Sequence, residues 1–111
     1  MTELARVDVE QRPGCTITTI TGELDISNLD AVRAKFERHV DTASSHVVDL
    51  SDTTYLDSAA IGLLFEFSER LHERRQALTL VVPRGSPVRR LVDLTGLSAR
   101  VRVHDQLDAA L

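Results

Sequence analysis

The sequence has 111 residues, of which 42% are hydrophobic and 27% are charged, and its formal net charge is -4. These values are ordinary for one folded domain with a single core, and they exclude wholesale disorder. The net negative charge argues against a general nucleic-acid-binding protein, because phosphate contacts need clustered lysine and arginine. The arginine pairs 74–75 and 89–90 are expected on solvated helix faces, where they are plausible contact residues.

The cysteine content and the N-terminal residues bear on the cellular location. Cys15 is the one cysteine, so neither an internal disulfide nor a cysteine-based metal site is possible. Its apolar surroundings predict a buried structural thiol. The N-terminal residues include Glu3 and Asp8 and no continuous apolar stretch, which is unlike a signal peptide, and no segment has the apolar length of a membrane span. We therefore expect a cytoplasmic protein without a membrane partner.

The first half of the chain predicts a hairpin followed by a helix. Residues 4–11 and 15–20 have the alternation and β-branched content of strands, joined by a turn at 12–14, and residues 21–22 should end the second strand. Ser27 is expected to cap the helix, with Asp30 completing a capping box. The inward face of this helix should carry Leu29, Val32, Phe36 and Val40.

The second half alternates strands and helices. Strands are predicted at 47–50, in the middle of the sheet, at 77–82, and at 101–103 on an edge, with a helix over 59–74 between the first two. The apolar stripe of that helix should carry Ile61, Leu64, Phe65 and Leu71. A short helix should begin at Ser86-Pro87 and end at Gly96, and Asp105 should cap a last helix ending at Leu111.

This order of elements predicts an α/β fold in a single domain over residues 1–111. An initial hairpin followed by alternating strands and helices indicates a mixed, mostly parallel sheet. We expect four to five strands flanked by about four helices.

Polar residues gather where two predicted strands end, in segments 21–25 and 50–58. The carboxyl ends of parallel strands share one edge of a sheet, so Asp25 and Asp57 should lie close together. Such an acidic site suits either a magnesium–nucleotide complex or a basic partner surface. Ser58 is the expected N-cap of the helix over 59–74, and capping alone is what most such serines do. Small residues follow it, so its hydroxyl should be accessible, and the helix N-terminus can accept a phosphate on it.

The sequence shows no enzymatic machinery. A serine nucleophile needs a positioned base, and of the four histidines only His104 is a candidate for the same edge as Ser58. No Gly-x-Ser-x-Gly elbow is present, no histidine pair has the i, i+4 spacing of a metal clamp, and no glycine-rich phosphate loop exists. We expect neither a catalytic residue, nor a metal site, nor a cofactor.

Three runs of residues resemble the STAS domain family, and more narrowly the bacterial anti-sigma factor antagonists, also called anti-anti-sigma factors. The run over 47–64 (VVDLSDTTYLDSAAIGLL) is similar to the family signature, TGELD over 21–25 to a second landmark, and RLVDLTGL over 90–97 to a third. The similarity extends from about residue 5 to the C-terminus. The family fold, a mixed sheet flanked by helices, agrees with the predicted elements.

The resemblance implies a regulator of bacterial transcription of the stress-response type. In this family an anti-sigma factor that is a serine kinase phosphorylates the serine after the signature aspartate, which corresponds here to Ser58 after Asp57. The unmodified antagonist binds the kinase, which releases its sigma factor; phosphorylation breaks the complex, and a metal-dependent serine phosphatase restores it. The implied partners are these proteins, with no direct nucleic-acid contact. The implied partner-binding residues are Glu23, Asp25, Asp57, Ser58, Ala59, Ala60 and Ile61.

The sequence departs from the family pattern directly after Ser58. Ala59 and Ala60 stand where the family often has serine or threonine and usually has glycine. Alanine favours the helix. The added methyl group at Ala60 can crowd a kinase nucleotide site or narrow the set of partners.

Two other functions are compatible with these residues. A STAS module can be an accessory subunit that binds a lipid- or anion-transport ATPase, although such members often lack the phosphorylatable serine. A STAS module can also sense a nucleotide or small molecule at the Asp25 and Asp57 edge, which predicts thermal stabilisation by a nucleotide alone.

Overall fold

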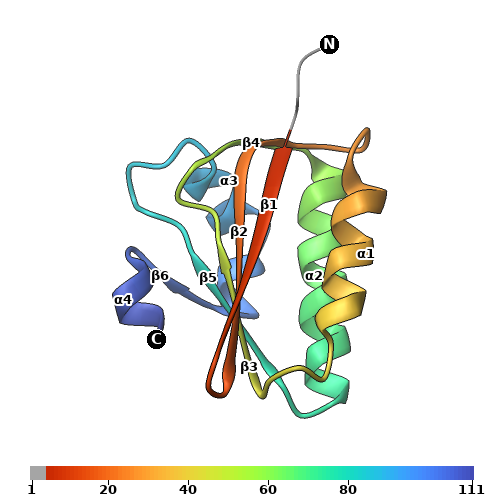
Figure 1. The fold of residues 1–111 in the computed structure, drawn as a ribbon. Helices are drawn as coiled ribbons and strands as arrows, with labels where there is room; N and C mark the ends of the chain where they lie inside the picture. Colours follow the sequence, from red (N-terminus) through yellow and green to blue (C-terminus); the bar gives the residue numbers. More distant parts are fainter. Residues whose placement is uncertain (1–4) are drawn as a thin grey trace.

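The computed structural model describes residues 5–111 (Figure 1). The elements in chain order are β1 (Ala5–Arg12), β2 (Cys15–Leu24), α1 (Leu29–His39), β3 (Ser45–Asp49), β4 (Thr53–Leu56), α2 (Ser58–Glu73), β5 (Ala77–Val81), α3 (Arg89–Leu94), the 3-10 turn η1 (Leu97–Ala99), β6 (Arg102–His104) and α4 (Leu107–Ala110). Within these residues no helix combines the length and the apolar character needed to cross a bilayer.

All six strands belong to one sheet. Its order is β1-β2-β3-β5-β6, with β4 pairing to β2 beyond the end of β3. Strand β1 is antiparallel to β2, and every other pairing is parallel. The predicted mixed, mostly parallel α/β fold is therefore confirmed, with β3 in the middle and β6 at an edge as expected.

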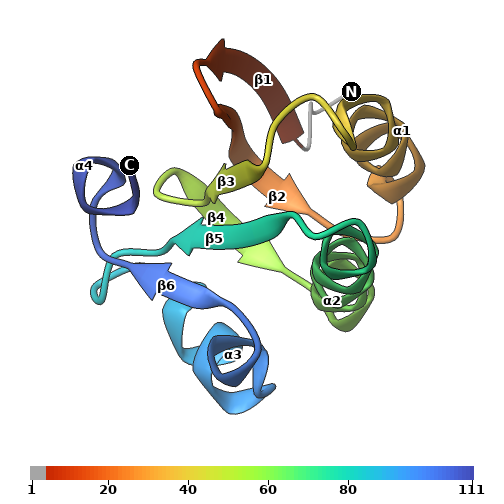
Figure 2. The ribbon, with the colours of Figure 1, turned by 90° about the horizontal axis from the view of Figure 1, so that it is seen from below.

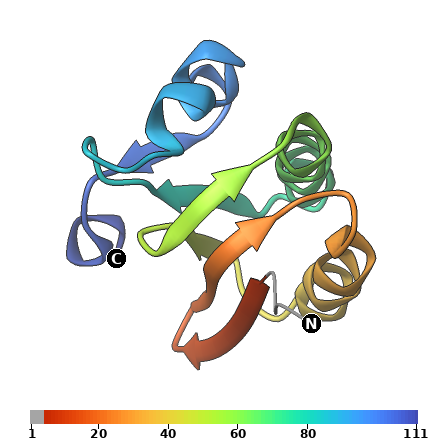
Figure 3. The same ribbon diagram turned by 90° about the horizontal axis from the view of Figure 1, so that it is seen from above.

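The helices cover the two faces of the sheet unequally (Figures 2 and 3). Helices α1 and α2 lie side by side on one face, and the short α4 lies on the other. The main core joins the first face to α1, α2 and the α3 region, and within it the rings of Phe36 and Phe67 stack with centroids 4.3 Å apart. On the other face Ile17, Val47 and Val81 are buried under Leu107 and Ala110. The carboxyl ends of the parallel strands therefore rest on a continuous apolar core.

Strand β4 is not among the predicted strands, because the sequence analysis places no element between the strand at 47–50 and the helix over 59–74. It pairs in parallel with the end of β2, which continues to Leu24 instead of stopping at Gly22. Gly22 has a φ of 95° at the point where the register shifts, a backbone conformation that glycine adopts readily. Thr53 is 1% exposed and donates from its hydroxyl to the carbonyl of Ile20 at 2.7 Å. This buried hydrogen bond joins β4, which shows no apolar alternation, to β2.

The predicted helix caps are mostly wrong, although the helices themselves exist. Helix α1 starts from Asn28 and no side chain caps it; the Ser27 hydroxyl donates to Asp25 instead, and Asp30 pairs with Arg33. The expected inward residues Leu29, Val32 and Phe36 are buried, and Val40 is the half-buried C-cap residue. The side chains of Ser27 and Asn28 are engaged in local hydrogen bonds within this segment, so neither of them caps α1.

Helices α3 and α4 also begin later than predicted. Ser86 accepts from the Val88 N–H, but α3 starts at Arg89. Gly96, with a φ of 83°, follows its end as expected. Gln106, without a side-chain bond, stands at the N-cap of α4, because Asp105 pairs instead with Arg84 and Arg89.

Two further predictions are changed by packing. Cys15 is half-buried at the hairpin end, against the small cluster under α4, so the expected buried thiol is only partly enclosed. Arg74 is exposed and pairs with Asp41, as a solvated helix face predicts. The side chain of Arg89 is only 20% exposed and donates to the Val82 carbonyl at 2.7 Å. Arg89 therefore holds the β5–α3 connection in place and is not a free surface residue.

Candidate functional site

The start of α2 is capped by Asp57, not by Ser58 as predicted. Asp57 has extended backbone angles, and its Oδ1 accepts from the Ala60 N–H at 2.8 Å. Its Oδ2 accepts from the Ile26 N–H at 3.0 Å. An aspartate is as good an N-cap as a serine, and this one satisfies a donor in another loop as well. Ser58 consequently becomes the first residue of the helix.

The hydroxyl of Ser58 is left free by this arrangement. The residue is exposed, and its hydroxyl makes no hydrogen bond to any of residues 5–111. A capping hydroxyl would be engaged with the backbone of the next turn, whereas this one faces solvent on a formed helix. Capping therefore does not account for Ser58, and its hydroxyl is free to be modified.

The two polar segments meet at one edge, as predicted. Leu24 and Leu56 are register partners at the ends of β2 and β4, and the Asp57 N–H donates to the Leu24 carbonyl at 3.4 Å. Asp25 follows directly and accepts from the Ser27 N–H at 2.9 Å. The parallel pairing of the two strands thus places the TGELD landmark beside the start of α2 (Figure 3).

The segments that form this edge carry acidic and no basic side chains. Between residues 13 and 32, and again between residues 39 and 69, the sequence contains no lysine or arginine. Glu23 and Asp52 are exposed, while Asp25 and Asp57 are half-buried by the hydrogen bonds that hold the loops. Among residues 5–111 no group of three or more carboxylates, histidines or cysteines is arranged to hold a metal ion.

Three of the predicted contact residues follow Ser58, and burial corrects two of them. Ala60 is 0% exposed and Ile61 is 5% exposed, so their side chains belong to the core. Only Ala59, which is half-buried, and Ser58 itself remain at the surface of this turn. The methyl group of Ala60 points into the protein, so the expectation that it crowds a kinase nucleotide site is wrong.

Two exposed apolar residues at this edge were not predicted. Ile26 is 77% exposed and lies between Asp25 and the start of α1, and Tyr55 is 49% exposed on β4 opposite Glu23. The signal in the sequence was an isoleucine in an otherwise polar segment directly after the TGELD landmark. A single exposed apolar residue is common, so Ile26 is notable here because a second one, Tyr55, lies at the same edge as Ser58.

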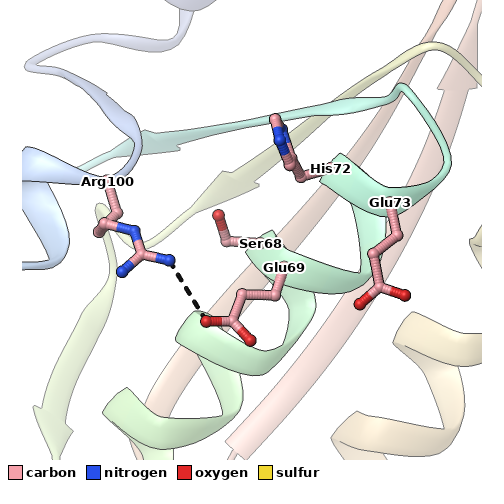
Figure 4. A pocket seen from close by; sticks show the side chains of 5 residues that line it. All are labelled: Ser68, Glu69, His72, Glu73 and Arg100. Carbon is pink, nitrogen blue, oxygen red and sulfur yellow. Dashed lines mark hydrogen bonds and ion pairs between the residues drawn. The ribbon is translucent and has the colours of Figure 1, made fainter.

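In the part of the chain that the structure describes, no histidine makes a hydrogen bond to Ser58, and His104, the candidate from the sequence, lies on β6, which β3 and β5 separate from β2 and β4. His39 contacts Gln11, and His46 is buried against Gln76, so neither contacts the α2 start. His72 lines a surface hollow together with Ser68, Glu69, Glu73 and Arg100 (Figure 4). Within it Arg100 pairs with Glu69 at 3.3 Å. The α2 residues that line the hollow lie about 15–22 Å along the helix from Ser58, at about 1.5 Å per residue, so the hollow is separate from the site at the helix start.

Known proteins share this arrangement of strands and helices. The sequence profile of the STAS domain matches residues 6–110. The anti-sigma-F factor antagonist RsfB of Mycobacterium tuberculosis is 31% identical over 106 residues, which cover 95% of this chain and 85% of RsfB. The crystal structure of an anti-sigma factor antagonist from Mycobacterium paratuberculosis superposes with a TM-score of 0.87 at 27% identity, covering 96% of this chain and 90% of the other.

A more distant structure supports the fold. The anti-sigma factor antagonist SpoIIAA in its unphosphorylated form has a TM-score of 0.72 at 19% identity, covering 94% of this chain and 92% of SpoIIAA. The family profile spans all but the ends of the chain, and the relatives are named for antagonism, not for a reaction. The resemblance seen in the three sequence landmarks is thereby confirmed, and the chain belongs to the STAS domain family.

Proposed function

We propose that this protein is an anti-sigma factor antagonist, and that it binds an anti-sigma factor through the surface around Ser58. Phosphorylation of Ser58 by the anti-sigma factor, acting as a serine kinase, then breaks the complex. The observation that carries this proposal is the free, exposed Ser58 hydroxyl at the start of a helix that Asp57 already caps. The names of RsfB and of the Mycobacterium paratuberculosis protein support it.

A phosphate at Ser58 acts mainly through charge. It adds about -1.5 to -2 charges at neutral pH, next to Asp57 and Asp25. In the free protein the group is solvated and lies at a helix N-terminus, where backbone N–H groups favour an anion. In a complex it must lose water among carboxylates, and a penalty of a few kcal/mol lowers affinity by about two decades.

The remaining partners follow from the same switch. A metal-dependent serine phosphatase would remove the phosphate and restore binding, so the antagonist would cycle between two states without unfolding. The protein would act in the cytoplasm, where sigma factors meet RNA polymerase, and would contact proteins and not nucleic acid. Its net charge of -4 is consistent with that choice of partner.

The test is phosphorylation by a purified anti-sigma factor. We would incubate the chain with Mg-ATP and, in turn, the anti-sigma-F factor of Mycobacterium tuberculosis and each anti-sigma factor kinase of the organism that encodes this chain. The expected result is one phosphate on Ser58 by mass spectrometry, lost in Ser58→Ala and kept in Ser51→Ala, an exposed serine after β3. Binding without transfer to any kinase would favour a transport-ATPase accessory role, and a phosphate on another residue would overturn the switch.

A further inference from the structure

Ile26 is the most exposed of the large apolar side chains in the described part of the chain. Four such side chains are well exposed, namely Ile26, Tyr55, Leu94 and Leu111. Single exposed apolar residues are common and by themselves indicate nothing. Two of these four, however, lie at the edge that carries Ser58, on the segment after β2 and on β4.

The backbone around Ile26 is held in place by side chains on both sides of it. Its own N–H donates to Asp57, which caps the helix that begins with Ser58. On the following side, Asn28 accepts from the Asp25 N–H at 3.0 Å and donates to the Glu23 carbonyl at 2.9 Å. These bonds fix the loop in a conformation that projects the isoleucine into solvent. A side chain held in this way loses little conformational entropy on binding.

The surroundings of Ile26 define the chemistry of what would cover it. Glu23, Asp25, Asp52 and Asp57 come from the same segments, which contain no lysine or arginine. On the side of β1, Arg6 and Lys35 line a hollow with Asn28, and Arg6 pairs there with Asp8. An apolar side chain within an acidic rim complements a basic face that contains an apolar recess. The Asp57 hydrogen bond also makes this surface continuous with the surface proposed for Ser58.

We infer that Ile26 is the apolar anchor of the contact with the anti-sigma factor, inserting into a recess on a basic face of that partner. This inference rests on the proposed function and adds the residue that supplies most of the short-range affinity. Binding energy in interfaces is concentrated in a few desolvated side chains, and charges at the rim mainly steer the encounter. Ser58 and its carboxylate neighbours then control when the partner binds, and Ile26 controls how tightly.

The experiment compares truncations of two exposed side chains, one at the Ser58 edge and one at the C-terminus. Ile26→Ala and Leu111→Ala each remove an exposed apolar side chain, and the C-terminus lies far from the Ser58 edge (Figure 1). Both variants are titrated against the anti-sigma factor that binds the wild-type chain, with association and dissociation rates measured at low and high salt. Thermal unfolding of both variants should match the wild type, because neither side chain is buried.

The expected result is that Ile26→Ala binds about tenfold or more weakly, mainly through faster dissociation, while Leu111→Ala binds like the wild type. The loss should be similar at both salt concentrations, because an apolar contact is not screened by ions. Wild-type affinity of Ile26→Ala, beside a wild-type chain that binds and is blocked by Ser58→Glu, would overturn the anchor and leave the proposed function standing. Failure of the wild-type chain to bind any anti-sigma factor would overturn both.

Discussion

The backbone N–H of Ile26 donates to Oδ2 of Asp57 at 3.0 Å, across 31 residues of sequence. The other oxygen of the same carboxylate caps α2 through the Ala60 N–H at 2.8 Å. One side chain therefore joins the loop after β2 to the start of the helix that presents Ser58. This carboxylate thus connects the signature run over 47–64 to the loop directly after the TGELD landmark.

Removing the Asp57 carboxylate should destabilise the protein. Asp57→Ala leaves the N–H groups of Ile26 and Ala60 without their acceptors, and the loss of an N-cap alone costs about 1–2 kcal/mol. Asp52→Ala is the matched control, because Asp52 is an exposed aspartate at the same edge whose side chain makes no hydrogen bond within residues 5–111. Urea unfolding should show the loss only for Asp57→Ala. Equal values for the two variants would contradict the dual role of Asp57.

Substitution of Ser58 should leave stability nearly unchanged. Its hydroxyl has no partner within the described chain, so Ser58→Glu should alter the free energy of unfolding by no more than about 0.5 kcal/mol. A carboxylate in the first turn of a helix even interacts favourably with the helix dipole. Thermal unfolding and kinase binding measured on the same sample separate the two effects. If the melting temperature dropped sharply, Ser58 would be chiefly structural.

Two glycines should respond oppositely to alanine. Gly62 lies inside α2 and Gly96 follows α3 with a φ of 83°, and a Cβ added at either position meets nothing within 4 Å. Steric contacts therefore do not distinguish the two substitutions, and the backbone conformation of each glycine sets the sign of the stability change. Gly62→Ala should stabilise by about 1 kcal/mol because alanine favours helices, whereas Gly96→Ala should destabilise by about 1 kcal/mol or more. Chemical denaturation measures both, and changes of the same sign would contradict the explanation.

His46 should make stability fall in mildly acidic solution. Its side chain packs edge-on against Phe67, with Nε2 at 3.0 Å from Gln76, and His39 and Asp41 are the titratable groups around it. Burial lowers the pKa of His46 below 6.5, and the hydrogen bonds to Gln76 and to the Ala43 carbonyl only partly oppose this.

The sign of the pH effect follows from proton binding. Below about pH 6.5 the unfolded state takes up a proton at His46 that the folded state resists, so the free energy of unfolding decreases as the pH falls. Above that pH His46 is neutral in both states, and this loss of stability is absent. Unfolding measured between pH 7.5 and about pH 5 should show a shallower slope for His46→Gln than for the wild type, with the exposed His72→Gln as control. Parallel curves for all three would contradict the assignment.

Much of the fold could be predicted from local patterns. The inward residues of α1 follow from their helical spacing, and β3 is recognisable as a short apolar run in the middle of the sheet. In α2 the spacing finds Ile61, Leu64 and Leu71, which are three of the six buried residues, and Phe65 is only half-buried. Strand β4 could not be found in this way. Its stability comes from pairing with β2 and from the buried Thr53 hydroxyl, both of which are long-range interactions.

The meeting of the two polar segments at one edge was predicted correctly, whereas the predicted cap of α2 was wrong. Asp57 and Ser58 are adjacent and both are good caps, so local propensity does not choose between them. The choice is made by the Ile26 N–H, which needs an acceptor that can reach across from α2, and a carboxylate with two oxygens serves both donors. Because Asp57 caps the helix, the Ser58 hydroxyl is not needed as a cap.

The sequence alone determined the α/β class, the order of most elements and the family, because hydrophobic periodicity and three spaced landmarks are properties of local segments. Only the tertiary structure decided that Ala60 and Ile61 face the core while Ile26 faces solvent. It also decided that Asp57, not Ser58, caps α2. These outcomes depend on the pairing of β2 with β4 and on the hydrogen bond from the Ile26 N–H to the Asp57 carboxylate. Both are long-range contacts, and long-range contacts leave no periodic signal in the sequence.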